Sequence, residues 1–436
     1  MERPNILFMH VDQMHGGAVS AYGCGLVHTP RMDQMAAEGH SFRRMYTAMP
    51  QCCPARASWY TGRMSKEHGV TVNGYPIDPE LPDLGQWLRR HGDYDCVYTG
   101  KWHVSGRKVG QSFDVLHHGH GHGELQDSDI ARSAVAYLAN RKDDQPFFLN
   151  VGFLNPHDCC FPAFREGGPC KYGIADDMLD QLPPLPENFD YGYPEHGHPA
   201  TRHWTLQDWR YYIYNYYRMV EMVDREIGRV YDAVRNSDLA KNTLIIFTAD
   251  HGDGAGFHAH ISKGYLEEEA WHVPAIVHAP GMAKPGTHDK THLASGVDVA
   301  ATICDYAGAP PLPKTTLARS WRPVLEGQDV PWREYVVGET SIGPLSTAIR
   351  EERYKTIFYE DRAKLYDLRD DPLEQRNLAE DPAHAATLAR HRGHLRDYVK
   401  SIEVYPGPEK GLKKVPNQGV LYGNYVKWYD QIKAEA

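Results

Sequence analysis

The chain has 436 residues, of which 41% are hydrophobic, and a formal net charge of −10 at pH 7. This length and apolar content can bury a large α/β core together with one smaller domain. The negative charge argues against a general nucleic-acid partner, and an anionic ligand would have to be held by a few local cations.

The first apolar run, residues 4–11, begins almost immediately after Met1. It has the composition of a core strand, so we expect no signal peptide before it. This predicts a cytoplasmic protein as the sequence is written, and a periplasmic or secreted one if the sequence is a mature form. No run approaches the roughly 18 apolar residues that a membrane span needs, which predicts no membrane association. The eight cysteines include two adjacent pairs rather than a dense framework, so we expect mostly reduced thiols.

Short apolar runs alternate with helical patterns over most of the chain. Residues 205–235 contain few helix breakers and carry apolar residues near helical spacing. Alternation of strand and helix predicts a large, mostly parallel sheet with helices on both faces. The expected strands of this sheet are residues 4–11, 95–99, 146–153, 243–249 and 274–278.

From about Trp332 the pattern changes to closely spaced short strands followed by one helical segment, residues 380–401. This predicts a small antiparallel sheet with a helix packed on it. The segment after Pro406 is rich in Gly, Pro, Tyr and Trp without clear periodicity, which predicts a tail packed on the surface. The expected parts are therefore a main α/β domain over residues 1–331, a C-terminal subdomain over 332–405 and a tail over 406–436. The expected strands of the subdomain are residues 334–338, 346–350, 354–359 and 363–368.

The most informative segment is residues 52–63, Cys-Cys-Pro-Ala-Arg-Ala-Ser-Trp-Tyr-Thr-Gly-Arg. Cys52, Pro54 and Arg56 have the spacing Cys-x-Pro-x-Arg. Cys-Pro dipeptides also occur in ordinary loops, so the pentad alone leaves a structural interpretation open. With the Thr-Gly-Arg that follows, the segment resembles the signature of type I sulfatases of the alkaline phosphatase superfamily. In that family the first cysteine is oxidised after translation to formylglycine, whose hydrate is the nucleophile.

The resemblance implies that Cys52 is converted by a formylglycine-generating maturation enzyme. A geminal diol suits the reaction, because one hydroxyl takes the sulfate and the other then expels it and restores the aldehyde, whereas a sulfated serine would be hard to hydrolyse. The resemblance also implies the alkaline phosphatase-like fold. That fold has a large, mostly parallel sheet sandwiched by helices, and a smaller C-terminal α+β domain with an antiparallel sheet. The segment 364–368, Lys-Leu-Tyr-Asp-Leu, resembles the second domain of the family.

Polar residues follow two of the expected strands. Asp12-Gln13 come after the first strand and Asp250-His251 after the fourth. Ligands of open α/β sheets bind beyond the carboxyl ends of the strands, and two carboxylates with an amide and an imidazole suit a divalent cation. For Asp250-His251 alone, a turn with Asp capping a helix is the alternative.

The family resemblance extends to this metal site. It implies one divalent cation held by Asp12, Gln13, Asp250, His251 and the converted Cys52. The family usually has a second aspartate at the position of Gln13. Calcium is the expected ion, and the loss of one negative charge at Gln13 leaves magnesium or manganese open.

Three further segments resemble the sulfate-binding segments of the family. They are Gly100-Lys101-Trp102-His103, Asn155-Pro156-His157-Asp158 and Lys263-Gly264 followed by Glu267-Glu268-Glu269. The resemblance implies that Lys101 and Lys263 bind sulfate, that His103 handles a proton and that His157 contacts the bridging oxygen. Singly each segment is weak, because a surface lysine is usually solvated and a histidine beside a strand is often only hydrogen-bonded. The three segments occur in the same order along the chain as in the family, and this shared order makes a chance agreement improbable.

The implied mechanism assigns the remaining roles. Arg56 and the metal would hold the aldehyde hydrate, and Asp250 would take its first proton. The two lysines and the metal would neutralise charge on the sulfuryl oxygens as the sulfur–oxygen bond breaks. His157 would protonate or support the leaving oxygen, and His103 would remove the second hydroxyl proton. Asn73 is an additional candidate for substrate binding.

Three function classes stay open at this stage. The first is a sulfuric-ester hydrolase that acts on a sulfated carbohydrate, as a small molecule or an oligosaccharide. The alternative is a formylglycine-dependent phosphonate monoester hydrolase or phosphodiesterase, because such relatives carry an Asp-Gln pair that resembles Asp12-Gln13. The presence of both Lys101 and His103 favours the sulfatase. The third is a non-catalytic binding module, in which Cys52 stays unconverted.

Other polar and aromatic segments have competing interpretations. The tract His117–His122 could bind metal, but its glycines favour a flexible loop near the pocket. The tyrosines of residues 211–217 could stack on sugar rings or lie on a half-buried helix. Further residues that could form the rim of the site are His196, His198, Arg202, His203 and Trp204.

Overall fold

The computed structural model describes residues 3–141, 145–171, 173–190, 198–342, 344–405 and 418–434, with the side chains of residues 418–425 left out. Within these ranges, no helix is both long enough and apolar enough to cross a membrane. All eight cysteines are free.

The main sheet has eight strands in the order β10-β2-β9-β7-β1-β6-β4-β5. Strands β7, β1, β6 and β4 at its centre run parallel to one another, while β9 is antiparallel to both β7 and β2. The predicted mostly parallel sheet is therefore confirmed. The strands are β1 (Asn5–Asp12), β2 (His40–Phe42), β4 (Asp95–Gly100), β5 (Asp114–His118), β6 (Phe147–Pro156), β7 (Thr243–Ala249), β9 (Ala275–His278) and β10 (Thr287–Asp289).

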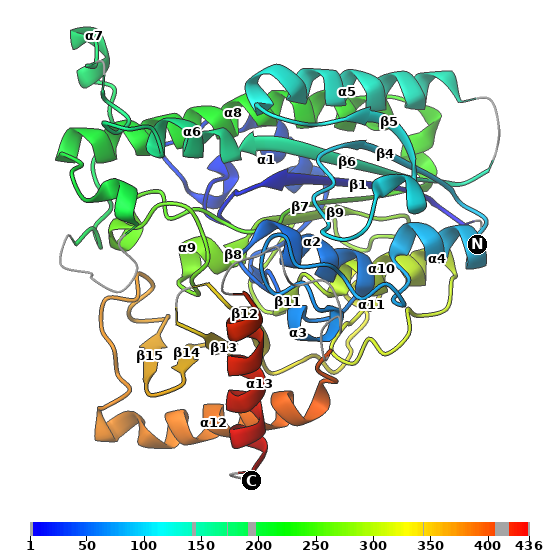
Figure 1. The fold of residues 1–436 in the computed structure, drawn as a ribbon. Helices are drawn as coiled ribbons and strands as arrows, with labels where there is room; N and C mark the ends of the chain where they lie inside the picture. Colours follow the sequence, from blue (N-terminus) through cyan, green and yellow to red (C-terminus); the bar gives the residue numbers. More distant parts are fainter. Residues whose placement is uncertain are drawn as a thin grey trace.

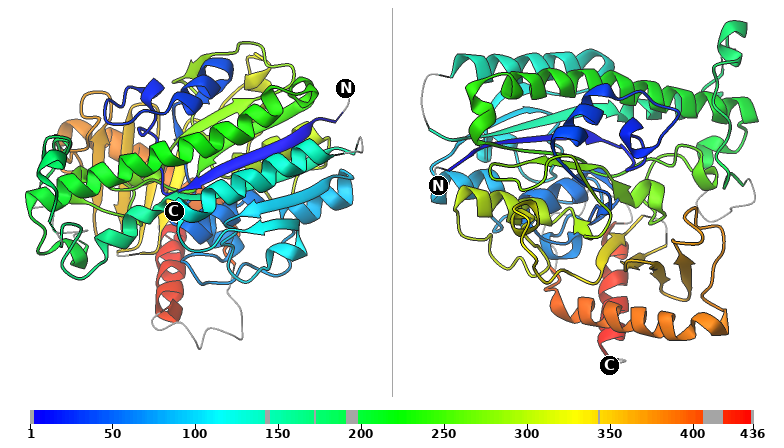
Figure 2. Two further views of the ribbon diagram at one scale, coloured as in Figure 1. Left: turned by 90° about the horizontal axis from the view of Figure 1, so that it is seen from above. Right: turned by 180° about the vertical axis from the view of Figure 1, so that it is seen from behind.

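Helices cover both faces of this sheet (Figures 1 and 2). One face carries α1 (Pro30–Glu38), α5 (Gly123–Asn140) and α8 (Leu206–Arg235), and the other carries α2 (Cys52–Thr61), α4 (Leu84–His91) and α10 (Asp298–Ala307). Every residue of β6 and β7 is buried, which explains why these strands are continuous apolar runs rather than alternating ones. The helix predicted over 205–235 is α8, which begins at a capping box formed by Thr205 and Asp208.

The C-terminal part forms a four-stranded antiparallel sheet, β12 (Val336–Thr340), β13 (Ser346–Arg350), β14 (Tyr354–Tyr359) and β15 (Ala363–Asp367). Helix α12 (Ala385–Ser401) packs against β13 and β14, as predicted. A third, three-stranded sheet contains β11 (Ala294–Ser295), β3 (Met45–Tyr46) and β8 (His272–Val273). We propose that the domain boundary falls just before β12.

The last described segment is helix α13 (Gln418–Ala434), which crosses α12 (Figure 1). The composition of the tail did not predict this helix, because Gly419 and Gly423 interrupt its pattern. Trp428, Tyr429 and Ile432 are buried at helical spacing, and this packing against the subdomain stabilises the helix. Residues 406–417 of the predicted tail lie outside the described residues.

Shorter helices connect these elements. They are α3 (Ser65–His68), α6 (Cys160–Ala163), α7 (Asp176–Leu179), α9 (Glu268–Trp271) and α11 (Arg322–Leu325). The 3₁₀ turns are η1 (Ser20–Tyr22), η2 (Val109–Gln111), η3 (His157–Cys159), η4 (Pro199–Thr201), η5 (Asp238–Asn242), η6 (Phe257–Ala259) and η7 (Pro382–His384).

Candidate active site

Cys52 is the first residue of helix α2 and is almost completely buried. Its Sγ lies 3.2 Å from Nε2 of His251 and 3.7 Å from Oδ1 of Asp12. The N-terminus of a helix favours negative charge, because its first backbone N–H groups have no partner within the helix. The residue predicted to become the nucleophile therefore lies directly against the two pairs of residues that follow β1 and β7.

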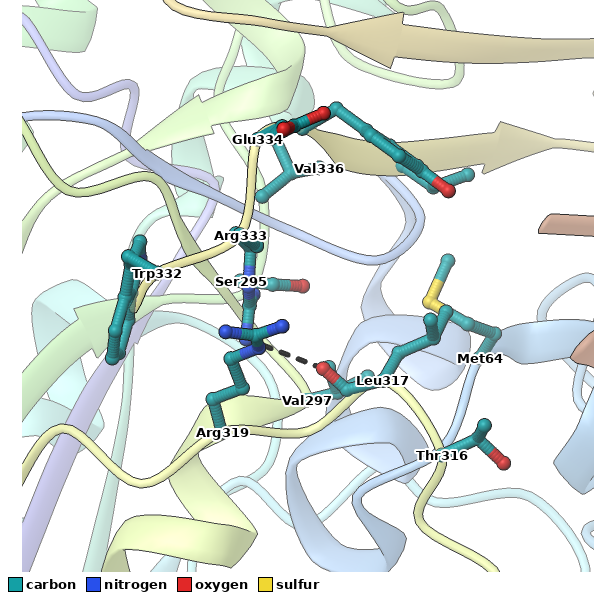
Figure 3. Close-up of a pocket in the computed structure, with 12 residues that line it drawn as sticks. Met64, Ser295, Val297, Thr316, Leu317, Arg319, Trp332, Arg333, Glu334 and Val336 are labelled. Carbon is teal, nitrogen blue, oxygen red and sulfur yellow. Dashed lines mark hydrogen bonds between the residues drawn. The ribbon is translucent and has the colours of Figure 1, made fainter. Parts of the chain in front are cut away.

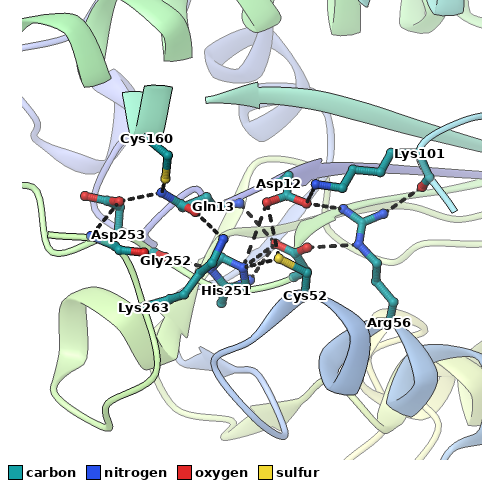
Figure 4. Close-up of polar contacts among 12 residues, drawn as sticks. Asp12, Gln13, Cys52, Arg56, Lys101, Cys160, His251, Gly252, Asp253 and Lys263 are labelled. Atoms are coloured by element: carbon teal, nitrogen blue, oxygen red, sulfur yellow. Dashed lines mark hydrogen bonds and ion pairs between the residues drawn. The ribbon is translucent and has the colours of Figure 1, made fainter. Parts of the chain in front are cut away.

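Asp12, Cys52, Asp250 and His251 form one buried cluster (Figure 4). Each offers one ligand atom, and these atoms all lie within 4.8 Å of one another. Strands β1 and β7 are parallel neighbours, so their carboxyl ends bring Asp12 and Asp250 together. Nδ1 of His251 lies 2.8 Å from the carbonyl oxygen of Gly252, which leaves Nε2 facing the cluster. Two carboxylates and an imidazole converging in this way fit a divalent cation.

Gln13 lies beside this cluster in a left-handed backbone conformation, with φ 75°. Its Nε2 donates to Oδ2 of Asp253 at 2.7 Å and to Sγ of Cys160 at 3.0 Å, and Lys263 Nζ donates to its Oε1 (Figure 4). The side chain of Gln13 therefore connects the second lysine to Asp253 and Cys160, and the backbone N–H of Gln13 donates to Oδ1 of Asp250 in the cluster. Sequence reasoning missed Asp253 and Cys160, although Asp253 stands in the same Asp-His-Gly-Asp segment as Asp250.

Arg56 follows Cys52 by one helical turn and is fully buried. Its Nε donates to Asp250 and its Nη2 to Asp12, both at 2.9 Å. Lys101, directly after β4, forms a second ion pair with Asp12 at 2.7 Å. Burial opposes the ionisation of Asp12, but its pKa is held well below the usual value by the nearby Lys101, His157 and Arg56. The pKa of Asp250, in contrast, is raised by burial and by the negative charge of Asp12. Of the two carboxyls, Asp250 is the better proton acceptor.

The two predicted histidines have opposite electrostatic surroundings. Burial favours neutral His103, but hydrogen bonds to the Cys52 and Cys53 thiols outweigh it and raise the pKa of His103 to about 9. Burial and the charge of Lys263 lower the pKa of His157 to about 3. In the unconverted chain His103 is therefore protonated at neutral pH and His157 is neutral.

A cavity of about 680 Å³ opens beside Lys101, His103 and His157. Apolar side chains make up much of its wall, and none of the lining residues is Asp or Glu. Besides the three named above, the lining residues are Gly100, Trp102, Lys108, Val109, Gly110, Gln111, Val115, His118, Gly119, His120, Gly121 and Leu154. The structure thus places part of the His117–His122 tract in the wall of this cavity.

A separate cavity of about 250 Å³ lies near the start of the C-terminal subdomain (Figure 3). It is lined by Met64, Val297 and Arg333 among others, and none of the predicted site residues contributes to it. Arg333 donates to the carbonyl oxygen of Leu317 (Figure 3) and also to Oδ1 of Asp298. These bonds join the two parts of the chain, which makes this cavity part of a structural contact.

Several of the remaining candidate residues have structural partners. Asn73 accepts a hydrogen bond from the backbone N–H of Cys53 at 2.9 Å, so it stabilises the start of α2. Tyr212, Tyr216 and Tyr217 are buried on α8, and Trp204 is buried against Trp209. The rings of His198 and Phe164 are stacked, while Arg202 and His203 are exposed and His196 lies outside the described residues.

A buried cysteine at a helix N-terminus faces the ends of two parallel strands, where four side chains could hold a metal ion. This site on a mostly parallel sheet covered by helices is that of a hydrolase of the alkaline phosphatase superfamily, and comparison with known proteins identifies the family. A sulfatase family model matches residues 4–309, and a model described as N-sulphoglucosamine sulphohydrolase, C-terminal, matches residues 256–401. The chain belongs to the sulfatase family and is a sulfuric-ester hydrolase. Members of this family generally use a divalent metal and a formylglycine.

Several characterised proteins are similar to the chain over nearly its whole length. The Delta 4,5-hexuronate-2-O-sulfatase of Bacteroides thetaiotaomicron is 30% identical, over 91% of this chain and 89% of that protein. The choline-sulfatase of Rhizobium meliloti is 28% identical, over 98% and 94%. The structure of a 2-O GAG sulfatase matches with a TM-score of 0.81 at 27% identity, over 93% and 96%. The phosphonate monoester hydrolase of Agrobacterium radiobacter shares the fold, with a TM-score of 0.76 at 24% identity, over 92% and 95%.

Proposed function

We propose that this sulfatase hydrolyses a sulfate ester of a carbohydrate, using a formylglycine made from Cys52 and one divalent cation. The observation that carries the proposal is the position of Cys52, with its Sγ 3.2 Å from His251 in the buried cluster that contains Asp12 and Asp250. Relatives named for hexuronate and N-acetylglucosamine sulfates support a sugar as the leaving group. Formation of the aldehyde requires a maturation enzyme as partner.

Asp12, Asp250, His251 and Gln13 would hold the cation together with the converted side chain of residue 52. Calcium fits the carboxylate and amide oxygens, and the imidazole leaves magnesium and manganese as alternatives. When bound, the cation supplies positive charge next to the nucleophile and the sulfuryl oxygens.

The protein's own groups divide the remaining work. Asp250 accepts the proton of the attacking hydroxyl at residue 52, which fits its raised pKa. Lys101 and Lys263 stabilise the sulfuryl oxygens as negative charge develops. Neutral His157 donates a hydrogen bond to the bridging oxygen. After conversion, when the Cys52 thiol is gone, His103 accepts the proton of the second hydroxyl at residue 52, the bond between carbon and the sulfate oxygen breaks, and the aldehyde is restored.

The cavity beside Lys101 supports an anionic sugar as substrate. Lys108 and the imidazoles of His118 and His120 add positive or neutral groups to a wall without carboxylates. Trp102 in the same wall provides a face on which a sugar ring can stack. A second negative group on the sugar, such as a carboxylate, would meet no repulsion there.

Hydrolysis of phosphonate monoesters is the second candidate. It is favoured by Gln13, which replaces the second aspartate usual in sulfatases. Lys101 and His103, both beside the reaction centre, favour the sulfatase. Turnover of aryl sulfate and aryl phosphonate esters separates the two, because a higher rate on the phosphonate would reverse this ranking.

The test of the primary proposal is release of sulfate from a panel of sulfated mono- and disaccharides. Co-expression with a maturation enzyme should lower the intact mass by about 18 Da through conversion at Cys52. Cys52→Ala should abolish turnover and leave the fold intact, because it removes the nucleophile. Cys53→Ala is the matched control and should retain turnover. Unchanged activity in Cys52→Ala would contradict the proposal.

A further inference from the structure

A second cluster of potential metal ligands comes from the chain on both sides of Lys263, with two residues before this lysine and one after it. His258 and His260 belong to the loop that follows β7, and Glu269 belongs to α9. One ligand atom from each lies within 4.8 Å of the other two. The three residues are 4%, 1% and 8% exposed, respectively, so the cluster is closed to solvent. No role in sulfate hydrolysis uses any of them.

The distances within this cluster fit one common metal ion. Nδ1 of His258 lies 3.0 Å from Oε1 of Glu269, and Nδ1 of His260 lies 3.7 Å from the same oxygen. With zinc–ligand distances of about 2.0–2.1 Å, the edge of a coordination tetrahedron is about 3.3–3.4 Å. The two measured separations lie on either side of this value, so small side-chain movements would give zinc geometry.

An amide group packs against the His258 ring. Nδ2 of Asn188 lies 3.2 Å from Nε2 and 3.4 Å from Nδ1 of His258, and it also donates to the carbonyl oxygen of Leu373. The amide therefore holds the position of the ring beside Glu269. A cavity of about 160 Å³ lined by Asn188, His258 and Glu269 has room for a water as fourth ligand.

We propose that His258, His260 and Glu269 bind a zinc ion that fixes the loop carrying Lys263. Two imidazoles and one carboxylate form a ligand set that favours zinc, unlike the carboxylate-rich cluster at Cys52. Asp253 accepts from the backbone N–H groups of Ala255 and Ser262, which closes the loop at its base. The metal would hold the middle of that loop, and Lys263 follows it directly.

A simple ion pair between His258 and Glu269 is the competing explanation, and another site in the chain offers a comparison. Asp289 also has two histidines on one carboxylate oxygen, with His40 at 3.3 Å and His292 at 2.6 Å. Among the described residues, however, these three do not form a group whose ligand atoms all lie within 4.8 Å of one another. The cluster at Glu269 differs from the Asp289 site because its two imidazoles and its carboxylate all lie close to one another, and not only each imidazole to the carboxylate.

The experiment is to count zinc in the full-length protein. The protein is loaded with zinc, dialysed against zinc-free buffer with excess calcium, and analysed by inductively coupled plasma mass spectrometry. We expect about one zinc ion per chain in the wild type. His260→Ala and Glu269→Gln should each retain less than about one tenth of that, because loss of a ligand weakens binding by more than about 100-fold. His292→Ala, which removes a histidine from the Asp289 site, should retain the wild-type amount.

Two results would overturn the proposal. One is a wild type that retains no zinc, and the other is a folded His260→Ala protein that retains as much as the wild type. If both variants fail to fold by circular dichroism, X-ray absorption at the zinc edge of the wild type decides. Two imidazoles in the spectrum support the cluster, whereas one imidazole, with or without sulfur, would place the zinc at His251 and Cys52. None of these readouts depends on turnover.

Discussion

At the scale of single residues, the site is organised by Arg56. Its guanidinium bridges Asp12 and Asp250, the two carboxylates that the parallel strands bring together. Two buried carboxylates so close would repel each other, and the bidentate arginine offsets that repulsion before any metal binds. The family motif therefore supplies both the nucleophile and the counter-ion of its metal site from a single turn of α2.

We predict that Arg56→Ala lowers the free energy of unfolding by about 3–5 kcal/mol in chelator, because buried Asp250 loses its arginine partner and buried Asp12 is left with its ion pair to Lys101. Excess calcium should recover part of this loss, since the cation neutralises the same two groups. Urea denaturation with EDTA and with calcium measures both effects. Arg63→Ala is the control, because Arg63 donates to the carbonyl oxygen of Pro313 and not to Asp12 or Asp250. The loss of unfolding free energy in Arg63→Ala should be the same in both buffers. If calcium leaves the loss in Arg56→Ala unchanged as well, this prediction is contradicted.

The sequence predicted Cys52, Asp12, Asp250 and Lys101 because each stands in a local motif at a strand or helix end. It could not predict that the amide of Gln13 contacts Asp253 and Cys160, because those contacts join segments 147 and 240 residues apart along the chain. Nor could it predict that Asn73 would accept from the backbone of Cys53. Motifs identify the residue types of a site, and the tertiary fold decides which atoms they contact.

At the scale of elements, long strands were predictable and short ones were not. β1, β6 and β7 have 8, 10 and 7 residues, and most of these residues are apolar. β3, β8 and β11 have two residues each, which is too few for any periodicity to appear. They pair because the larger elements hold their backbones in register.

The end of β4 depends on the close approach of two glycines. Gly100 has φ 100°, and a Cβ on it would lie 2.0 Å from the carbonyl oxygen of Gly152 in β6. We predict that Gly100→Ala lowers the free energy of unfolding by more than about 2 kcal/mol, because the strand end must move. Displacement of Lys101 next to it should reduce kcat/KM for the sulfate ester by about 100-fold.

The control for this prediction is Gly25→Ala. Gly25 is exposed and nothing lies within 4 Å of a Cβ there, so neither stability nor turnover should change appreciably. Urea denaturation and sulfate release measure the two effects. A Gly100→Ala protein with wild-type stability would show that the strand end tolerates a side chain, contrary to the prediction.

His68 connects two helices and makes the stability of their contact depend on pH. It ends α3, accepts from the backbone N–H of Val70, and lies 3.0 Å from Oγ of Ser58 in α2. Burial lowers the pKa of His68 to about 3, below the unfolded value of about 6.5. The stability it contributes is therefore complete above pH 6.5 and is lost as pH falls toward 3.

We predict that the wild type loses about 2 kcal/mol through this residue between pH 7 and pH 5. His68→Gln lacks the titration, so its stability deficit relative to the wild type should shrink by that amount. Chemical denaturation at the two pH values measures the deficit. His203→Gln, at an exposed position, is the control, and its difference from the wild type should not change with pH. A deficit of His68→Gln that is equal at both pH values would contradict the argument.

At the scale of the whole molecule, the C-terminal subdomain supports the loop that carries the second sulfate-binding lysine. Thr340 of β12 donates to the carbonyl oxygen of Gly264, and Lys355 of β14 donates to that of Leu266, both at 2.9 Å. Lys355 also forms ion pairs with Glu268 and Glu374. The antiparallel sheet thus holds the segment next to Lys263 from the side opposite the main sheet, and the active site needs both parts of the chain.

This arrangement predicts that Lys355→Met, far from the reaction centre in sequence, lowers both stability and turnover. Lys355 is fully buried, and its loss should cost about 3–5 kcal/mol because Glu268 and Glu374 lose their counter-ion.

Burial raises the pKa of Glu374 to about 7 even with Lys355 present, so protonation can relieve part of the penalty at low pH. A carboxyl with a raised folded pKa loses its stabilising contribution as pH rises through that pKa, and the cost should therefore be larger at pH 8 than at pH 6. Urea denaturation at the two pH values measures the stability, and kcat/KM for the sulfate ester measures the turnover. The control is Lys400→Met, on the exposed face of α12. This control should change neither the stability nor the turnover. A Lys355→Met protein with a pH-independent cost and normal turnover would show that the subdomain does not support the Lys263 loop.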